Sequence, residues 1–192
     1  VRELADDPRG VDRDGELRMR FRNGLLRDVA YEGMSYRRRM RIHGLAAETL
    51  ERISDDRDSD AEMLAHHFWQ AGDSERTWEY SRRAADTSRR AYANAAAASQ
   101  IERALEASRW LAEVDSDERY GLWVHLGELR DRTGLLQAAL DAYDRAAKLL
   151  DDDPTERSRL LLRRAHTHER AGSYSVALRV VRRAYALLDG VA

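Results

Sequence analysis

The sequence predicts an all-α protein, built as an array of antiparallel helix pairs behind a short N-terminal segment of a different kind. Three observations support this class. The 192 residues include only two prolines and many alanines, which favours helix over most of the chain. Apolar residues recur at helical spacing in one segment after another. Finally, Gly72, Gly134 and Gly172 separate consecutive helical segments, so the chain repeats a helix-turn-helix unit.

The N-terminal segment begins without an apolar period. Residues 1–16 are rich in Asp, Arg and Gly and are expected to be a flexible lead. Residues 17–21 alternate apolar and basic side chains, which predicts a short, half-buried strand. Asn23 is the expected N-cap of a helix over 25–32, and a longer helix is expected over 36–53.

Residues 54–60 contain only turn-forming Ser, Asp and Arg, and they mark the clearest internal boundary. Seven further helices are expected beyond it, over residues 61–71, 74–92, 93–112, 118–133, 135–150, 155–171 and 173–188. We therefore divide the chain into a lead (1–16), an N-terminal unit (17–53) and a repeat array (61–192).

Composition narrows the function. The chain has no cysteine, which excludes disulfides, thiolate zinc sites and cysteine nucleophiles. Its net charge of -2 does not favour nucleic acid globally, and no apolar run approaches a membrane span. Without a recognisable secretory signal, we expect a cytoplasmic protein. The chain opens at Val1 rather than Met, as a fragment of a longer protein would.

The most specific pattern lies in residues 123–146 and reappears twice. Its members are Trp123, Leu126, Gly127, Gly134, Ala139, Tyr143 and Ala146. A second copy holds Leu161, Arg164, Ala165, Gly172, Ala177, Val181 and Ala184, and an earlier copy holds Leu64, Ala65, Phe68, Gly72, Thr77, Ser81 and Ala84. The small residues let the two helices of a pair approach closely, and the large ones fill the space beside them.

This spacing resembles the tetratricopeptide (TPR) repeat. The resemblance implies a right-handed superhelix of antiparallel helix pairs, with a groove that binds a segment of another protein. The alternative is a plain antiparallel helical bundle with glycine turns.

A second resemblance covers the N-terminal segment. Residues 21–32 (FRNGLLRDVAYE), followed by the arginine-rich residues 37–51, are similar to a segment of large bacterial STAND/AAA-type signalling ATPases. These include proteins linked to adenylate or guanylate cyclases and LuxR- or SARP-type regulators. The resemblance implies a short winged-helix-like segment leading into a TPR array. It also implies a regulatory arm, with any ATPase or cyclase lying upstream.

The TPR resemblance places a partner groove along the first helix of each repeat. The residues expected there are Glu62, His66, Trp69, Val124, Glu128, Asp131, Leu162, His166 and Glu169. Such acidic, aromatic and His side chains favour a basic or mixed peptide, supplied by another protein or by the parent protein's own ATPase module. Trp69 is equally compatible with a core position. A homo-oligomer formed through an exposed last helix is a further expectation.

No active site is expected in this chain. There is no phosphate-binding loop and no Gly-x-Ser-x-Gly elbow. His66 and His67 are expected on different helix faces, so neither a metal site nor a cofactor is expected. The dense basic run of Arg37, Arg38, Arg39 and Arg41 is best explained as an exposed helix face, or by pairing with Glu48 and Glu51.

Two alternative functions stay open. A nucleic-acid-binding regulator fragment would place the arginines at 37–41 on phosphate, although nucleic acid is not the expected partner. A free-standing TPR adaptor is the other. No membrane association is expected for either.

Overall fold

The computed structural model describes residues 23–189 of the chain, and within them it contains nine α-helices, one 3₁₀ turn and no strand. The helices are α1 (Gly24–Glu32), α2 (Tyr36–Ile53), α3 (Ala61–Ala71), α4 (Ser74–Arg90), α5 (Asn94–Ala107), α6 (Ser116–Arg132), α7 (Leu136–Ala147), α8 (Pro154–Arg170) and α9 (Tyr174–Asp189). The 3₁₀ turn η1 (Ser108–Trp110) follows α5. The expected lead and strand lie outside the described residues. None of the helices between residues 23 and 189 is long and apolar enough to cross a bilayer.

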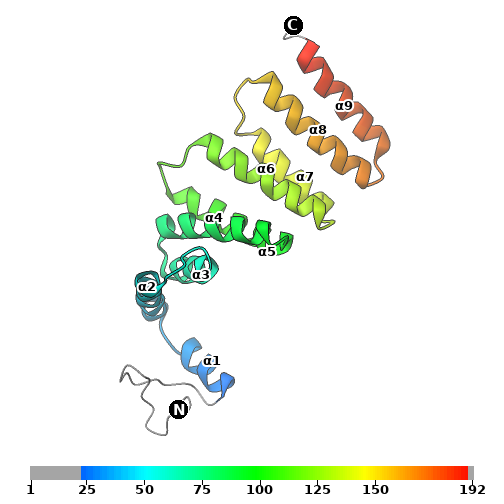
Figure 1. Cartoon of the computed structure of the whole chain (residues 1–192). Helices are drawn as coiled ribbons and strands as arrows, with labels where there is room; N and C mark the ends of the chain where they lie inside the picture. Colours follow the sequence, from blue (N-terminus) through cyan, green and yellow to red (C-terminus); the bar gives the residue numbers. More distant parts are fainter. Residues whose placement is uncertain (1–22, 190–192) are drawn as a thin grey trace, which may run out of the picture.

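The helices follow one another along the array, with α1 and α9 at opposite ends (Figure 1). The most extensive packing occurs within three pairs, α4–α5, α6–α7 and α8–α9, and packing between pairs is weaker. Because short turns join the members of each pair, the two helices run antiparallel. The described part of the chain is therefore an all-α, TPR-like array of helix pairs, which confirms the predicted fold class.

Four inter-helix turns share one geometry. The turn residue lies in the left-handed region at Gly72 (φ 78°), Tyr92 (φ 57°), Gly134 (φ 81°) and Gly172 (φ 73°). In each turn the next N–H donates to the carbonyl five residues earlier, as in the bonds Asp73 to Phe68, Ala93 to Ser88, Leu135 to Arg130 and Ser173 to His168. Tyr92 thus occupies a position that usually requires glycine. An alignment on glycines alone could not find the α4–α5 repeat.

Helix α4 takes part in two pairs that share the same kind of turn. The sequence placed α4 as the second helix of a repeat that begins with α3, and Thr77 and Ala84 are buried as that repeat requires, but α4 packs more extensively on α5, so we pair α4 with α5. The α4–α5 pair then has small buried residues where the other two pairs have them. These are Ala97, Ala139 and Ala177 at one position and Ala104, Ala146 and Ala184 at another, all at most 8% exposed.

Side-chain size is complementary where paired helices meet. Gly127 in α6 faces Tyr143 in α7, and a Cβ atom at Gly127 would overlap the Tyr143 ring. The equivalent residues are Ala85 with Ile101 in α4–α5, and Ala165 with Val181 in α8–α9. The smallest residue therefore accompanies the largest partner, which keeps the packing dense in each pair.

The N-terminal helices differ in how firmly they join the array. Ala47 of α2 is fully buried and shares a core with Leu64, Ala65 and Phe68 of α3, so this core extends across the boundary expected at residues 54–60. Helix α1 buries none of its residues. The winged-helix-like assignment of residues 17–53 stays a prediction, because its expected strand lies outside the described residues.

Two helices, α5 and α7, end three or more residues earlier than predicted, for local reasons. After α5 the chain tightens into η1, where the Ser108 hydroxyl donates to the Leu105 carbonyl at 2.8 Å. After α7 the N–H groups of Lys148 and Leu149 bond to carbonyls three residues back, which closes that helix as a tighter turn.

Candidate functional site

A cleft of about 470 Å³ lies between α6 and α8, with α7 behind it. We call it the α6–α8 cleft. It is lined by Glu128, Asp131 and Arg132 of α6, Tyr143 of α7, and Arg163, His166 and Arg170 of α8.

Asp131 is the most constrained group in the cleft. Only 7% of the residue is exposed, and its Oδ2 accepts a hydrogen bond from Arg170 Nη1 at 2.5 Å. The same nitrogen donates to the Asp131 backbone carbonyl at 2.6 Å, and His166 Nδ1 lies 3.8 Å from Oδ2. The other carboxylate oxygen, Oδ1, is buried and has no hydrogen-bond partner in the described structure. A buried acceptor without a donor is costly, and because this oxygen is closed off from solvent, a group in the cleft does not reach it in this arrangement.

A second ion pair forms the opposite part of the wall. Arg163 Nε donates to Glu128 Oε1 at 2.8 Å across the gap between α8 and α6. Beneath them, burial raises the pKa of Tyr143 to about 12, and the carboxylates of Glu128 and Asp131 add to the effect. The phenol is therefore neutral at physiological pH, and its ring forms an uncharged base to the cleft.

The lining carries more arginine than carboxylate. Arg132, Arg163 and Arg170 stand against Glu128 and Asp131, which leaves a surplus of one positive charge. A smaller adjoining cleft of about 290 Å³ shares Glu128 and Arg132 and adds Arg89 and His125. This face of the array therefore carries a small surplus of positive charge, which does not favour the expected basic peptide but is compatible with the expected mixed one.

The three arginines escaped the sequence analysis for a geometric reason. Arg132, Arg163 and Arg170 each directly follow a residue that we expected in the groove. A helix turns about 100° per residue, so a stripe drawn through every third or fourth position misses them. Their side chains are long enough to reach back into the cleft. The available signal was the repeated pairing of a groove position with an arginine immediately after it.

The structure distributes the nine expected groove residues unevenly. Glu128, Asp131 and His166 come together in the α6–α8 cleft. Val124 lies in the hydrophobic core beside Tyr143 and Leu160 and is only 6% exposed. The remaining five are exposed but line neither cleft: Glu62, His66, Trp69, Leu162 and Glu169. Glu62, His66 and Trp69 lie on α3. The helix that faces α6 on this side of the array is α4, which contributes Arg89 to the smaller cleft, so the α3 residues do not reach either cleft.

The three-histidine cluster, which consists of His43, His66 and His67, was not expected. The ring centroids lie 5.0 to 5.8 Å apart, so the rings of His66 and His67 come together rather than diverge. Nδ1 of His43 and Nδ1 of His67 share a hydrogen bond at 2.8 Å, and Tyr31 of α1 bonds to His43 Nε2 at 2.9 Å. Burial lowers the pKa of all three histidines, so the cluster is predominantly neutral at pH 7. Within residues 23–189, no group of three or more His, Cys, Asp or Glu side chains is arranged to hold a metal ion.

The arginine run on α2 lies largely on an exposed helix face, which is one of the two arrangements expected from the sequence. Arg39 stacks over the Tyr31 ring, with its guanidinium carbon 5.4 Å from the ring centroid. Glu51, an expected partner of the run, instead accepts from the Tyr80 hydroxyl at 2.5 Å and lies 3.7 Å from Arg76. The other three arginines, at 37, 38 and 41, are exposed.

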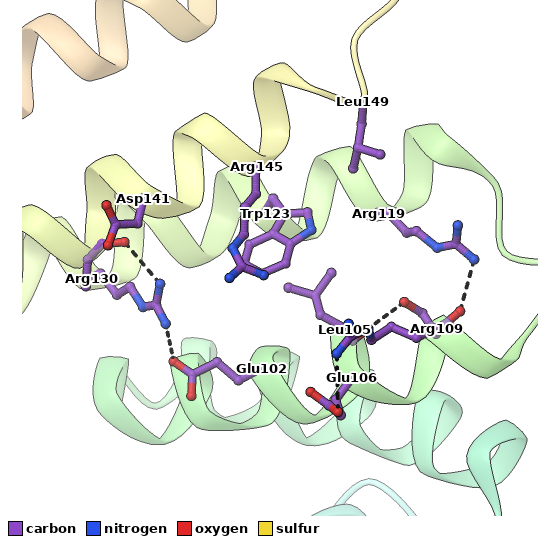
Figure 2. Close-up of a pocket in the computed structure, with 12 residues that line it drawn as sticks. Glu102, Leu105, Glu106, Arg109, Arg119, Trp123, Arg130, Asp141, Arg145 and Leu149 are labelled. Atoms are coloured by element: carbon purple, nitrogen blue, oxygen red, sulfur yellow. Dashed lines mark hydrogen bonds and ion pairs between the residues drawn. The ribbon is translucent and has the colours of Figure 1, made fainter.

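A further cleft, of about 620 Å³, surrounds Trp123 between α5, α6 and α7 (Figure 2). The Arg145 guanidinium carbon lies 4.9 Å from the Trp123 ring centroid. Arg130 bonds to Glu102 at 2.7 Å, and Arg119 Nη2 donates to the Ser108 and Leu111 carbonyls at 2.9 and 3.0 Å. Because Arg119 and Arg130 hold the polypeptide itself, we assign no ligand to this cleft.

Comparisons with known proteins give no family. No family model matches the chain, and no curated protein matches it. Among solved structures, "Crystal structure of BtubC (BKLC) from P. vanneervenii" is 16% identical with a TM-score of 0.49, covering 88% of this chain and 79% of that one. "MamA MSR-1 C2" is 21% identical with a TM-score of 0.44, covering 87% of this chain and 99% of that one. At these values neither likeness bears on function, and the fold rests on the helix pairs themselves.

Proposed function

We propose that this chain is a non-catalytic interaction and regulatory module that binds a segment of a protein in the α6–α8 cleft. The observation that carries the proposal is the surplus of arginine in this open cleft, where Arg132, Arg163 and Arg170 line the wall together with Glu128 and Asp131. TPR-like arrays commonly present such clefts to partner proteins.

The chemistry of the cleft defines the segment. Carboxylates on the segment would meet the surplus arginine. An extended peptide suits this cleft, because its side chains project on either side and can present a carboxylate to the arginines. The predicted ligand is therefore an acidic, extended segment.

We place this module in a multidomain bacterial signalling ATPase or transcriptional regulator. The similarity of residues 21–32 and 37–51 to STAND/AAA-type proteins supports this context. The segment could then belong to the parent protein's own ATPase module. Binding would act by population shift, because a segment that fits one arrangement of the array favours that arrangement.

The test uses the whole chain as bait for cytoplasmic protein, at low and at roughly physiological salt. Arg163 and Arg170 form ion pairs in the cleft, whereas Arg132 forms none within residues 23–189. Arg132→Glu reverses this charge and should abolish capture of a specific partner. Arg109→Glu is the matched control, because that side chain is 73% exposed and lies at the Trp123 cleft. Capture that survives Arg132→Glu would refute the proposal. Recovery of nucleic acid that disappears as salt rises would instead favour the alternative function through the arginines at 37–41.

A further inference from the structure

The outer face of α9 differs from the corresponding faces of α5 and α7. These three are the second helices of their pairs, and the turn residues Tyr92, Gly134 and Gly172 set their register. Six residues after each turn residue stand Ala98, Leu140 and Leu178. Ala98 is 9% exposed and Leu140 is 8% exposed, whereas Leu178 is 53% exposed. A helix follows α5 and α7 in the array, and in the described structure none follows α9 (Figure 1).

An ion pair joins each pair of helices to the next at a second equivalent position. Ten residues after the turn residue, Glu102 of α5 meets Arg130 of α6, with Oε1 and Nη2 2.7 Å apart. Asp144 of α7 meets Arg164 of α8 at the same distance of 2.7 Å. The residue at this position in α9 is Arg182, which is exposed. This position therefore holds a carboxylate that pairs with an arginine in α5 and α7, but it holds an arginine in α9.

The reversal extends along the helix. Helices α5 and α7 each combine two carboxylates with one arginine, whereas α9 contains three arginines and a single carboxylate, Asp189, at its last residue. Exposed apolar side chains accompany Arg182 on one stripe: Leu178 (53% exposed), Tyr185 (61%) and Leu188 (38%). Arg182, Tyr185 and Leu188 follow Leu178 by four, seven and ten residues, which is the spacing of a helix-packing face.

We propose that the outer face of α9 docks an acidic amphipathic helix of a partner protein, packed as α6 packs on α5 and α8 packs on α7. A helix with an arginine at the position of Arg130 or Arg164 would bring like charge against Arg182. A carboxylate at that position of the docked helix would pair with Arg182, so the ion pair would form with the positive charge on α9 and the negative charge on its partner. A second copy of α9 would set its own arginines against these three, so the occupant is acidic rather than identical.

The probe is a synthetic peptide with the sequence of residues 154–170, carrying the two changes Arg157→Glu and Arg164→Glu. In the protein these two arginines line a gap against Ala147 at the end of α7 and Leu150 just after it, so the changes reverse the charge of the face that packs on a second helix. The unchanged peptide is the control. By fluorescence anisotropy with the whole chain, the changed peptide should bind about tenfold tighter than the unchanged one.

Exchanging the charge on the protein makes the test specific. Arg182→Asp recreates the Asp144–Arg164 arrangement, so it should invert the preference and favour the unchanged peptide. Arg182 is exposed, and circular dichroism will show that the variant is folded. Arg132→Glu alters the α6–α8 cleft and the smaller cleft adjoining it, but not the outer face of α9, so it should leave peptide binding unchanged; this keeps the proposal separate from the proposed function.

Three results would overturn the inference. Equal binding of the two peptides, or a preference that ignores Arg182→Asp, would show that α9 does not select an acidic helix. Self-association of the chain alone in sedimentation, lost in Leu178→Ser, would assign the face to a second copy. Binding to phosphatidylglycerol vesicles that Arg182→Asp abolishes, without binding of either peptide, would assign it to a lipid surface.

Discussion

Two glycines of α6 should respond to alanine with opposite signs. A Cβ at Gly121 meets no atom within 4 Å, whereas a Cβ at Gly127 overlaps the ring of Tyr143. Alanine favours a helix over glycine by about 1 kcal/mol, and both positions lie inside the helix. Gly121→Ala should therefore raise the free energy of unfolding by about 1 kcal/mol.

At Gly127 the steric term outweighs this gain. Tyr143 is 2% exposed and three of its ring atoms would overlap the new methyl group, so the ring or the helix must move. Overpacking of a dense core costs about 1–3 kcal/mol, and we expect the upper end here. After subtraction of the gain in helix propensity, Gly127→Ala should lower the free energy of unfolding by about 2 kcal/mol. In a chain of this size, this corresponds to a fall in Tm of about 4–8 °C.

The protein itself suggests the compensating change. The α4–α5 pair holds Ala85 and Ile101 where α6–α7 holds Gly127 and Tyr143. Tyr143→Ile should therefore cost less in the Gly127→Ala background than in the native protein, with a coupling energy of about 1 kcal/mol or more. Urea unfolding followed by circular dichroism measures all four proteins. If Gly127→Ala stabilised as Gly121→Ala does, the close approach of α6 and α7 would be refuted.

Three further outcomes follow from local features. Tyr92→Gly should stabilise by about 0.5–1 kcal/mol, because it relieves a left-handed residue that is 87% exposed, whereas Tyr92→Ala should give no such gain in urea unfolding. Arg170→Met removes the partner of the buried Asp131 carboxylate and should lower stability by about 1.5–3 kcal/mol, while Arg132→Met should change the urea midpoint little. Because the pKa values of the three-histidine cluster lie below 6.5 in the folded state, the unfolded chain binds more protons and stability falls as pH drops below 6.5. Replacing all three with Gln should reduce the loss of stability between pH 7.5 and 5.5, and replacing the exposed His125 should not.

Local chemistry made much of the fold predictable. The bounds of α2 and α3 agree with the prediction to the residue. Asp73, Asp115 and Asp153 cap the helices that follow them, with side-chain to backbone bonds of 3.0, 2.7 and 2.8 Å. Capping and glycine turns act over a few residues, so sequence reveals them directly. The α4–α5 repeat was missed because its turn residue is Tyr92, whose left-handed backbone is imposed by packing on either side.

The charge of the candidate site was not predictable in the same way. Glu128, Asp131 and His166 do meet, as the repeat spacing implied. The sign of the local charge depends on Arg163 and Arg170, which reach across from α8 to carboxylates on α6. These partners are 35 and 39 residues apart in the chain. A helical period describes one helix at a time and cannot identify such pairs.

The three-histidine cluster shows the same limit in another part of the chain. His66 and His67 are adjacent on α3, where a helical wheel separates them by about 100°. His43 of α2 lies between the two directions, with its ring 5.8 Å from one and 5.0 Å from the other. Only the packing of α2 on α3 brings the third ring into place.

Small residues and arginines have different roles in this array. The small residues recur at equivalent positions in every pair, because the approach of two helices depends on them and tolerates little change. The arginines change from pair to pair: they join helices at Arg130 and Arg164, surround a buried carboxylate at Arg170, and face outward at Arg182. Recurrence therefore marks the residues that hold the fold, and the positions where an equivalent charge changes sign mark the surfaces available to a partner. By this criterion α9 is a surface to test, and the α6–α8 cleft is the other because surplus arginine lines it. Each has a single-residue charge reversal that should affect one of them without affecting the other.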